Sequence, residues 1–165
     1  MKMTTRKAAA ADLPDVAALY AASISKMRED GIEQWDEIYP DRELLEEDIA
    51  SGQMVLCGLQ DTLASAFTLN RACDAEYETG RWSTGVSYMV VHRLCVSPSL
   101  QNRGIGAQTM LLLEDMVRAQ GMEAVRLDAF SRNPHALRMY EKLGYTRAGQ
   151  VYWRKGLFYL YEKAL

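Results

Sequence analysis

Apolar side chains recur at helical spacing in the first third of the chain. Val16, Leu19 and Tyr20 fall on one face of a helix, and this pattern predicts an amphipathic helix. Asp12 stands just before this stripe and is predicted to cap the helix N-terminus with its carboxylate. Residues 42–52 repeat the helical pattern and end in glycine, which predicts a second, shorter helix. The stretch before Asp12 leaves room for one strand.

The middle of the chain changes to extended patterns. Residues 54–60 and 62–70 are apolar runs on either side of Asp61, and this arrangement predicts a hairpin. Residues 86–96 give the strongest strand signal of the chain, because β-branched and aromatic side chains dominate them. The polar segment 71–85 between these runs is predicted to be a loop or a broken strand.

The second half of the chain alternates between the two patterns. Asn133 followed by Pro134 is a typical helix start, and Gly144 is a typical helix end. In chain order we expect a helix with its apolar face at Ile105, Leu112, Leu113 and Met116, a strand at 124–130, a helix at 134–144, and strands at 145–153 and 156–165. The whole pattern predicts one α+β domain over residues 1–165, with a mixed sheet and helices on both faces.

Composition narrows the class of protein. The chain has 165 residues, 48% hydrophobic and 25% charged, with a net charge of −3, so it does not have the strong positive charge of a nucleic-acid binder. It has neither a signal-peptide pattern nor an apolar run of the roughly 18 residues that a membrane span needs. Its cysteines, Cys57, Cys73 and Cys95, have no disulfide or metal-site spacing. We therefore expect a cytoplasmic protein without a metal or membrane partner.

The segment 97–110, SPSLQNRGIGAQTM, leads through two glycines into a helix. Such turns hold phosphate groups, because free backbone N–H groups and the positive end of the helix dipole meet there. The segment lacks the GxxxxGK[ST] pattern of a P-loop. A dinucleotide site would use Asp128 for the ribose, but Thr109 occupies its third glycine position and residues 97–103 make the turn too long. The glycines could also serve only to cap the helix.

Residues Gln101 to Gly106 match the (Q/R)xxGx(G/A) pattern of the GCN5-related N-acetyltransferases (GNAT). The neighbouring segments HRLCVSP, NPHALRMYEKLGY and VYWRKGLFYLYEK resemble the central strand, late helix and closing hairpin of that family. The resemblance is close over residues 88–165 and looser before them. The chain departs from the family pattern in having Tyr145 where phenylalanine is usual and a longer loop at 70–86.

This resemblance implies the GNAT fold, in which α/β/α layers surround a mixed, mostly antiparallel sheet of six or seven strands with about four helices. It also implies acetyl-CoA as cofactor, with its pyrophosphate on the backbone amides of Arg103 to Ala107 and its pantetheine arm along the backbone at Val96. Asn133 is both a predicted helix cap and a family cofactor position. The cofactor residues so implied are Leu94, Val96, Gln101, Asn102, Arg103, Gly104, Ile105, Gly106, Ala107 and Asn133.

Acetyl transfer needs a base for the amine and a proton donor for the leaving thiolate. By resemblance, Tyr140 is the general acid, although its spacing also fits a core tyrosine. His92 stands where many relatives carry a glutamate that acts as the general base. The ordinary pKa of histidine, near 6.5, suits the same role. Asp128 is the second candidate, and a water chain is a third. Because the family uses direct transfer, Cys95 is expected to be a core residue rather than a nucleophile.

Two loops rich in acidic and aromatic residues, 30–41 and 73–82, are expected to receive the acceptor. Their carboxylates and rings would attract a cationic amine. However, charged residues in loops often only keep the surface solvated, and Trp35 could instead fill the core. The expected substrate residues are Glu33, Trp35, Tyr39, Tyr77 and Trp82. The sequence thus predicts an acetyl-CoA-dependent N-acetyltransferase for a primary amine, small molecule or peptide. The alternative is a non-catalytic acyl-CoA-binding sensor or partner module. Pairing of the closing strands could also give a homodimer.

Overall fold

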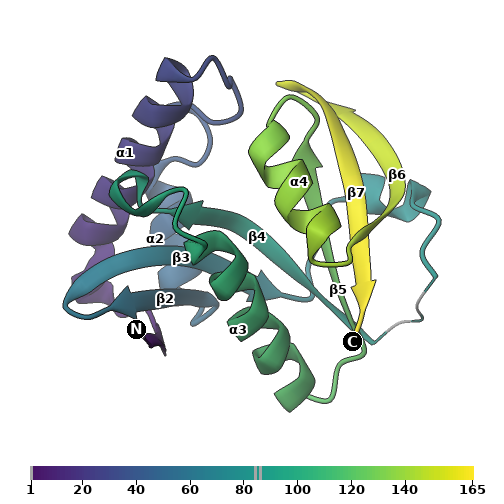
Figure 1. Cartoon of the computed structure of the whole chain (residues 1–165), viewed down its shortest axis with the longest axis horizontal. Helices are drawn as coiled ribbons and strands as arrows, with labels where there is room; N and C mark the ends of the chain where they lie inside the picture. The colour runs from purple at the N-terminus through teal and green to yellow at the C-terminus, as the bar shows by residue number, and fades with distance from the viewer. Residues whose placement is uncertain (1, 84, 86) are drawn as a thin grey trace. The chain divides into compact units, whose positions relative to one another are not determined.

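A computed structural model describes residues 2–83, 85 and 87–165, which form seven strands, four α-helices and three short 3₁₀ helices (Figure 1). Residues 84 and 86, in the predicted loop and at the start of the predicted strand, lie outside the described residues. In chain order the elements are β1 (Met3–Lys7), η1 (Ala10–Asp12), α1 (Leu13–Glu29), α2 (Arg42–Ala50), β2 (Met54–Leu59), β3 (Thr62–Asn70), η2 (Ala75–Thr79), β4 (Tyr88–Val96), η3 (Pro98–Leu100), α3 (Ile105–Ala119), β5 (Ala124–Phe130), α4 (Pro134–Lys142), β6 (Thr146–Trp153) and β7 (Gly156–Ala164).

The strands form one mixed sheet in the order β1-β2-β3-β4-β5-β7-β6. The pairs β1–β2, β2–β3, β5–β7 and β7–β6 are antiparallel, whereas β4 and β5 run parallel. The parallel register joins Tyr88–Val90 to Ala124–Arg126. The predicted α+β class, with six or seven strands and about four helices, is confirmed. The predicted loop at 71–85 contains the additional short helix η2.

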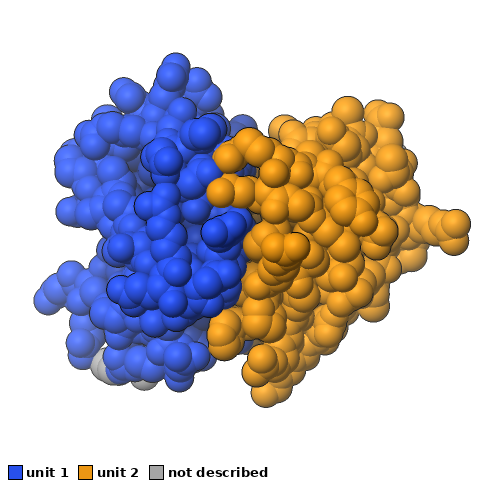
Figure 2. Space-filling model, turned by 90° about the horizontal axis from the view of Figure 1, so that it is seen from above, with its two compact units in different colours: residues 1–69, 93–109 blue, residues 70–92, 110–165 orange. Residues whose placement is uncertain are grey.

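The chain divides into two compact units, which Figure 2 colours separately. Unit 1 contains residues 1–69 and 93–109, and unit 2 contains residues 70–92 and 110–165. Strand β4 and helix α3 each contribute residues to both units. The two units are described in turn.

The core of unit 1 forms where the apolar stripe of α1 meets α2 and the strands β2 and β3. Val16, Leu19 and Tyr20 are at most 7% exposed, as the helical pattern predicts. Trp35 belongs to the same core, with its ring centroid 5.6 Å from that of Tyr20. Cys95 is also part of this core, so its predicted structural role agrees with its burial.

The predicted capping role of Asp12 is wrong. Its carboxylate makes no cap hydrogen bond to α1 and instead accepts the Ala9 N–H at 2.7 Å and two bonds from Arg6. Residues Ala10–Asp12 form the 3₁₀ turn η1 before the helix, so this carboxylate stabilises that turn. In contrast, Asp41 caps α2 by accepting the Leu44 N–H at 2.9 Å.

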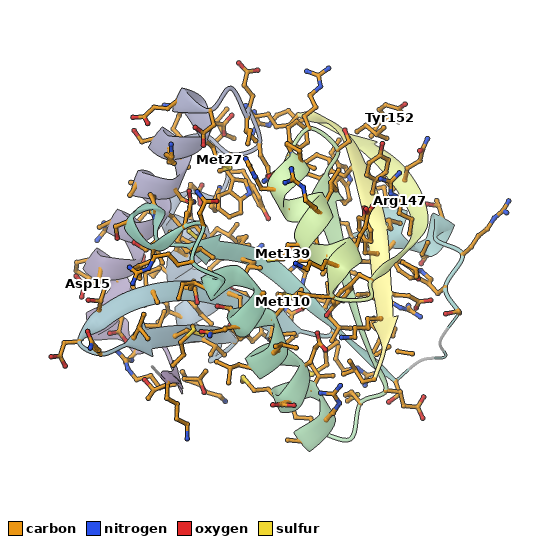
Figure 3. All side chains as sticks on the ribbon, in the orientation of Figure 1. Asp15, Met27, Met110, Met139, Arg147 and Tyr152 are labelled. Atoms are coloured by element: carbon orange, nitrogen blue, oxygen red, sulfur yellow. The ribbon has the colours of Figure 1, made fainter. Side chains whose placement is uncertain are left out.

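Unit 2 packs an aromatic cluster between α4 and the antiparallel strands β5, β7 and β6, which run beside that helix in Figure 1. The Tyr140 ring contacts those of Tyr145 and Tyr161, at centroid distances of 5.8 and 6.2 Å. On the outer strand β6, Arg147 contacts this cluster, because its Nε donates to the Tyr161 hydroxyl at 3.1 Å, whereas Tyr152, labelled in Figure 3, is 73% exposed.

The apolar face of α3 differs in part from its prediction. Leu113 is buried as predicted, but Leu112 and Met116 are only half-buried. Met110, labelled in Figure 3, is fully buried, and so is the acidic Glu114, which accepts a 2.6 Å bond from Lys163. Among the helices of the described ranges, none combines the length and apolar character required to span a membrane.

Candidate active site

The turn before α3 presents backbone N–H groups at a helix N-terminus. Asn102 and Gly104 have positive φ angles of 61° and 77°, and both residues are exposed. A Cβ on Gly104 would meet no atom within 4 Å, so its conformation, rather than space, favours glycine there. The first helical bond runs from the Gln108 N–H to the Gly104 carbonyl at 3.0 Å. The amides of residues 105–107 precede that bond and are suited to bind an anion.

Strand β4 has an irregular backbone conformation at Arg93, just before the predicted cofactor positions Leu94 and Val96. Arg93 has a φ of +53°, which is unusual for a residue other than glycine. The Tyr20 hydroxyl donates to the Arg93 carbonyl at 2.5 Å. Cys95 points into the core of unit 1, so by strand alternation Leu94 and Val96, both half-buried, face the other side.

A buried ion pair holds the Arg93 side chain. Arg93 Nε and Nη2 each donate to one carboxylate oxygen of Asp48 at 2.8 Å, and the two side chains are 10% and 8% exposed. The Thr68 hydroxyl donates to Asp48 at 2.9 Å, and Arg93 Nη1 donates to the Tyr39 hydroxyl at 3.0 Å. The pair therefore joins α2, β3 and the loop 30–41 to the irregular point of β4.

His92, the first candidate base, lies in unit 2 at the edge of a polar turn. Its Nε2 is 2.8 Å from Asn70 Oδ1 and 2.9 Å from the Ala72 carbonyl oxygen. The ring is half-buried. The structure therefore places the predicted base in a defined hydrogen-bonding environment at the start of the loop that follows β3.

Asp128, the second candidate base, accepts a 2.6 Å hydrogen bond from the Tyr77 hydroxyl. Tyr77 is 3% exposed and stacks on Trp82, whose indole N–H donates to the Tyr77 carbonyl at 2.8 Å. The indole approaches Gly80 so closely that a Cβ there would lie 2.5 Å from it. This packing holds the loop around η2 against the carboxylate of β5.

A charged pair beneath Trp82 anchors the same loop. The Arg126 guanidinium lies 4.4 Å from the Trp82 ring centroid and 3.9 Å from that of Tyr88. It pairs with buried Glu162, which also accepts bonds from the backbone and side chain of Ser83. Arg126 donates to the Gly85 carbonyl as well.

Tyr140, the predicted acid, is 7% exposed on α4. Burial raises the pKa of its phenol, and the negative charge of Asp128 raises it further. The hydroxyl therefore stays protonated at neutral pH. Asn133 caps α4 as predicted, by accepting the Ala136 N–H at 3.2 Å.

The predicted acceptor residues fall into two groups. Trp35 and Tyr77 are buried: the first fills the core of unit 1, which is the alternative that the sequence left open for it, and the second donates to Asp128. Glu33 and Tyr39 are exposed and Trp82 is half-buried. The salt bridge between Arg28 of α1 and Glu37 of the loop 30–41 lies on the surface.

Sequence reasoning missed Asp48, Arg93 and Asn70. One signal existed for Asp48. It stands three residues after Leu45, and Ile49 stands four residues after Leu45, so the carboxylate falls on the apolar side of the helix. A carboxylate on an apolar face requires a buried partner. For Asn70 and Arg93 the sequence gives no comparable signal, because their roles arise from contacts distant in the chain.

Thiol labelling tests the structural role of Cys95. Burial raises the pKa of its thiol to about 12, which leaves only ~10⁻⁴ of it as thiolate at pH 8. Cys57 is also buried, whereas Cys73 is exposed. We expect iodoacetamide to modify one thiol rapidly in the native protein and all three after denaturation, as read by mass spectrometry. Cys73→Ser should abolish the rapid reaction, and rapid alkylation of that variant would contradict the assignment.

The seven-stranded mixed sheet, with a glycine-containing turn at the start of α3, has the architecture of an N-acyltransferase fold. Residues 24–145 match the family model described as the acetyltransferase (GNAT) family, so the chain belongs to this family of N-acetyltransferase enzymes. The predicted family is thereby confirmed. A search of curated proteins finds no match.

Solved structures agree on the fold. A GNAT-family acetyltransferase from Streptococcus agalactiae 2603 shares 22% identity, covering 99% of this chain and 95% of its own, with a TM-score of 0.86. One from Listeria monocytogenes 4b F2365 shares 23%, covering 99% and 95%, with a TM-score of 0.79. The PaiA N-acetyltransferase of Thermoplasma acidophilum, in complex with coenzyme A, shares 19% and covers all of both chains, with a TM-score of 0.77.

Proposed function

We propose that this protein transfers an acetyl group from acetyl-CoA to a primary amine of a small molecule or peptide. The turn at residues 101–107 is the observation that carries the proposal, since it offers helix amides without an intrahelical partner and a left-handed glycine in a GNAT chain. The coenzyme A complex of the Thermoplasma acidophilum neighbour supports the choice of cofactor.

The residues of this turn fit the pyrophosphate of coenzyme A. Amides of residues 105–107 point along the axis of α3, where the helix dipole favours negative charge. Exposed Arg103 adds a cationic side chain, and Gly104 allows the sharp turn between them. Backbone groups at Leu94 and Val96 would pair with the pantetheine arm. When bound, acetyl-CoA supplies the thioester that the amine attacks.

The chemistry on the protein side is one proton taken from the acceptor amine and one hydrogen bond donated to the leaving sulfur. His92 takes the proton of the acceptor ammonium, and Asp128 is the alternative base. Tyr140 donates a hydrogen bond to the sulfur as negative charge develops there. Because burial raises its pKa, complete proton transfer to a thiolate is uphill, so the hydrogen bond itself is the main contribution. No covalent acyl-enzyme is required.

The acceptor is proposed to be cationic before it loses its proton. In unit 2, the carboxylate of Asp128, held by Tyr77, supplies negative charge that attracts an ammonium group. In unit 1, the exposed Glu33 and Tyr39 offer a carboxylate and an aromatic ring, which also attract cations. The proposed location of this chemistry is the cytoplasm. The proposed assembly, if the protein is not a monomer, is a homodimer formed through the closing strands β6 and β7.

Thermal unfolding with acetyl-CoA tests cofactor binding. A ligand at about 100 times its dissociation constant adds about 2.7 kcal/mol to the free energy of unfolding, which should raise the Tm by roughly 5–10 °C for a chain of this size. Gly106→Glu places a carboxylate in the turn and should abolish the rise. Ala50→Glu adds the same charge on the exposed side of α2 and should retain it.

The same experiment separates the enzyme from the alternative, a non-catalytic acyl-CoA-binding sensor. Both predict the rise in Tm, but only the enzyme consumes acetyl-CoA when a panel of amines is added. A wild-type protein that shows no rise at saturating acetyl-CoA would contradict both functions. Binding without turnover on amines of every class would favour the sensor.

A further inference from the structure

The contacts of His92 determine which of its ring nitrogens carries a proton. Nε2 lies 2.9 Å from the carbonyl oxygen of Ala72, and a backbone carbonyl can only accept a hydrogen bond. Nε2 must therefore be the donor. This inference depends on the chemistry of the carbonyl and not on any assumed orientation of a side-chain amide.

Asn70 adds a second acceptor at the same nitrogen. Its Oδ1 accepts the Ala72 backbone N–H at 2.9 Å, which identifies that atom as the oxygen of the amide rather than its nitrogen. The same Oδ1 lies 2.8 Å from His92 Nε2. A single oxygen thus organises the turn at Ala72 and receives the imidazole N–H.

A neutral imidazole has one N–H and one basic nitrogen. Since Nε2 carries the hydrogen, Nδ1 is the basic atom. We propose that Asn70 is a positioning residue, which together with the Ala72 carbonyl holds His92 as the Nε2–H tautomer and makes Nδ1 the atom that takes the proton of the acceptor amine. The step breaks an ammonium N–H bond, forms an Nδ1–H bond and leaves an imidazolium whose Nε2–H bonds remain in place.

The orientation also stabilises the charged product of this step. Protonation at Nδ1 requires no ring rotation, because both acceptors at Nε2 suit the imidazolium as well as the neutral ring. The assignment of His92 as the base belongs to the proposed function, on which this part of the inference rests. The tautomer itself is a property of the resting protein.

Nuclear magnetic resonance of the imidazole nitrogens tests the tautomer without any substrate. The chain has two histidines, so a His135→Gln variant, altered at an exposed position of α4, assigns both sets of signals. We expect long-range ¹H–¹⁵N correlations to show neutral His92 with the proton on Nε2 and a basic Nδ1. Observation of the Nδ1–H tautomer in the wild-type protein would overturn the proposal.

Two variants at Asn70 test the positioning. Asn70→Ala removes the acceptor that orders both the turn and the ring, so a population with the proton on Nδ1 should become measurable and kcat should fall about tenfold. The KM for acetyl-CoA should not change. Asn70→Asp keeps an oxygen at both contacts and should preserve the tautomer and most of kcat.

The outcomes separate the two proposals. If Asn70→Ala changes neither the tautomer nor kcat, Asn70 is not a positioning residue. If it changes the tautomer while the kcat of a verified acetyltransferase stays the same, the tautomer assignment stands and His92 is not the base, which overturns the positioning role. A protein that never turns over contradicts the proposed function, yet its spectrum still decides the tautomer.

Discussion

Tyr140→Phe should lower kcat by about 10²–10³-fold while the dissociation constant of acetyl-CoA stays within about twofold. The variant removes only one hydroxyl, and the loss of one hydrogen-bond donor to developing negative charge has an effect of this size. The ring remains available to pack against Tyr145 and Tyr161, so the fold of unit 2 should be unchanged. Steady-state kinetics and calorimetric titration with coenzyme A measure the two quantities.

The pH dependence of the wild-type enzyme provides a second readout of the same residue. Tyr140 acts in its protonated form, which is present below its pKa. Burial, followed by the charge of Asp128, raises that pKa above the ordinary value of 10. Activity that depends on Tyr140 should therefore persist through pH 10 rather than decline there.

Tyr145→Phe is the matched control. It makes the same chemical change on the neighbouring ring, where the hydroxyl donates to buried Glu114 at 3.3 Å. We expect a modest loss of stability, about 1 kcal/mol, with kcat nearly unchanged. A Tyr140→Phe enzyme as active as the wild type at every pH would show that Tyr140 is only a core residue.

Local patterns predicted most of the fold because they depend on neighbours in the chain. Asn133 and Pro134 begin α4, the many β-branched and aromatic residues mark β4, and the structure has both elements. The capping prediction for Asp12 is wrong because its carboxylate accepts hydrogen bonds from Ala9 and Arg6, which precede it, rather than from α1, which follows it. A cap residue can satisfy either set of donors, and only the path of the chain decides between them.

The site was less predictable because its environment is assembled from distant segments. An aromatic residue in a polar loop has the same sequence signature whether it faces solvent or fills a core, and Trp35 and Tyr77 prove to be buried. The Tyr77–Asp128 contact joins residues 51 positions apart. Its geometry depends on how η2 packs on β5, and no spacing in the sequence encodes that.

Asp48→Ala should destabilise the protein by about 3–5 kcal/mol, because it leaves the Arg93 guanidinium buried without its counter-ion. The bidentate pair is almost fully enclosed, and the Thr68 hydroxyl also loses its acceptor. Urea unfolding of the wild type and the variant measures the difference. A loss below about 1 kcal/mol would mean that water or another group solvates Arg93 once Asp48 is gone.

Two comparisons identify the source of that loss. The Arg28–Glu37 bridge is as short, at 2.6 Å, but its side chains are 57% and 78% exposed, so Glu37→Ala should leave the free energy of unfolding within experimental error. The double variant Asp48→Leu with Arg93→Met replaces both charges by apolar groups and should recover most of the stability. If the double variant is as unstable as Asp48→Ala, the loss comes from packing and not from an unpaired charge.

The ion pair also has a consequence for the site. Arg93 adopts its left-handed φ directly before Leu94 and Val96, and the bonds from Tyr20 and to Asp48 hold it there. Without Asp48 this conformation loses its support, and the backbone expected to pair with the pantetheine arm should become less ordered. Asp48→Ala should therefore raise the KM for acetyl-CoA at temperatures where the variant is still folded. An unchanged KM would separate the ion pair from cofactor binding and confine its role to stability.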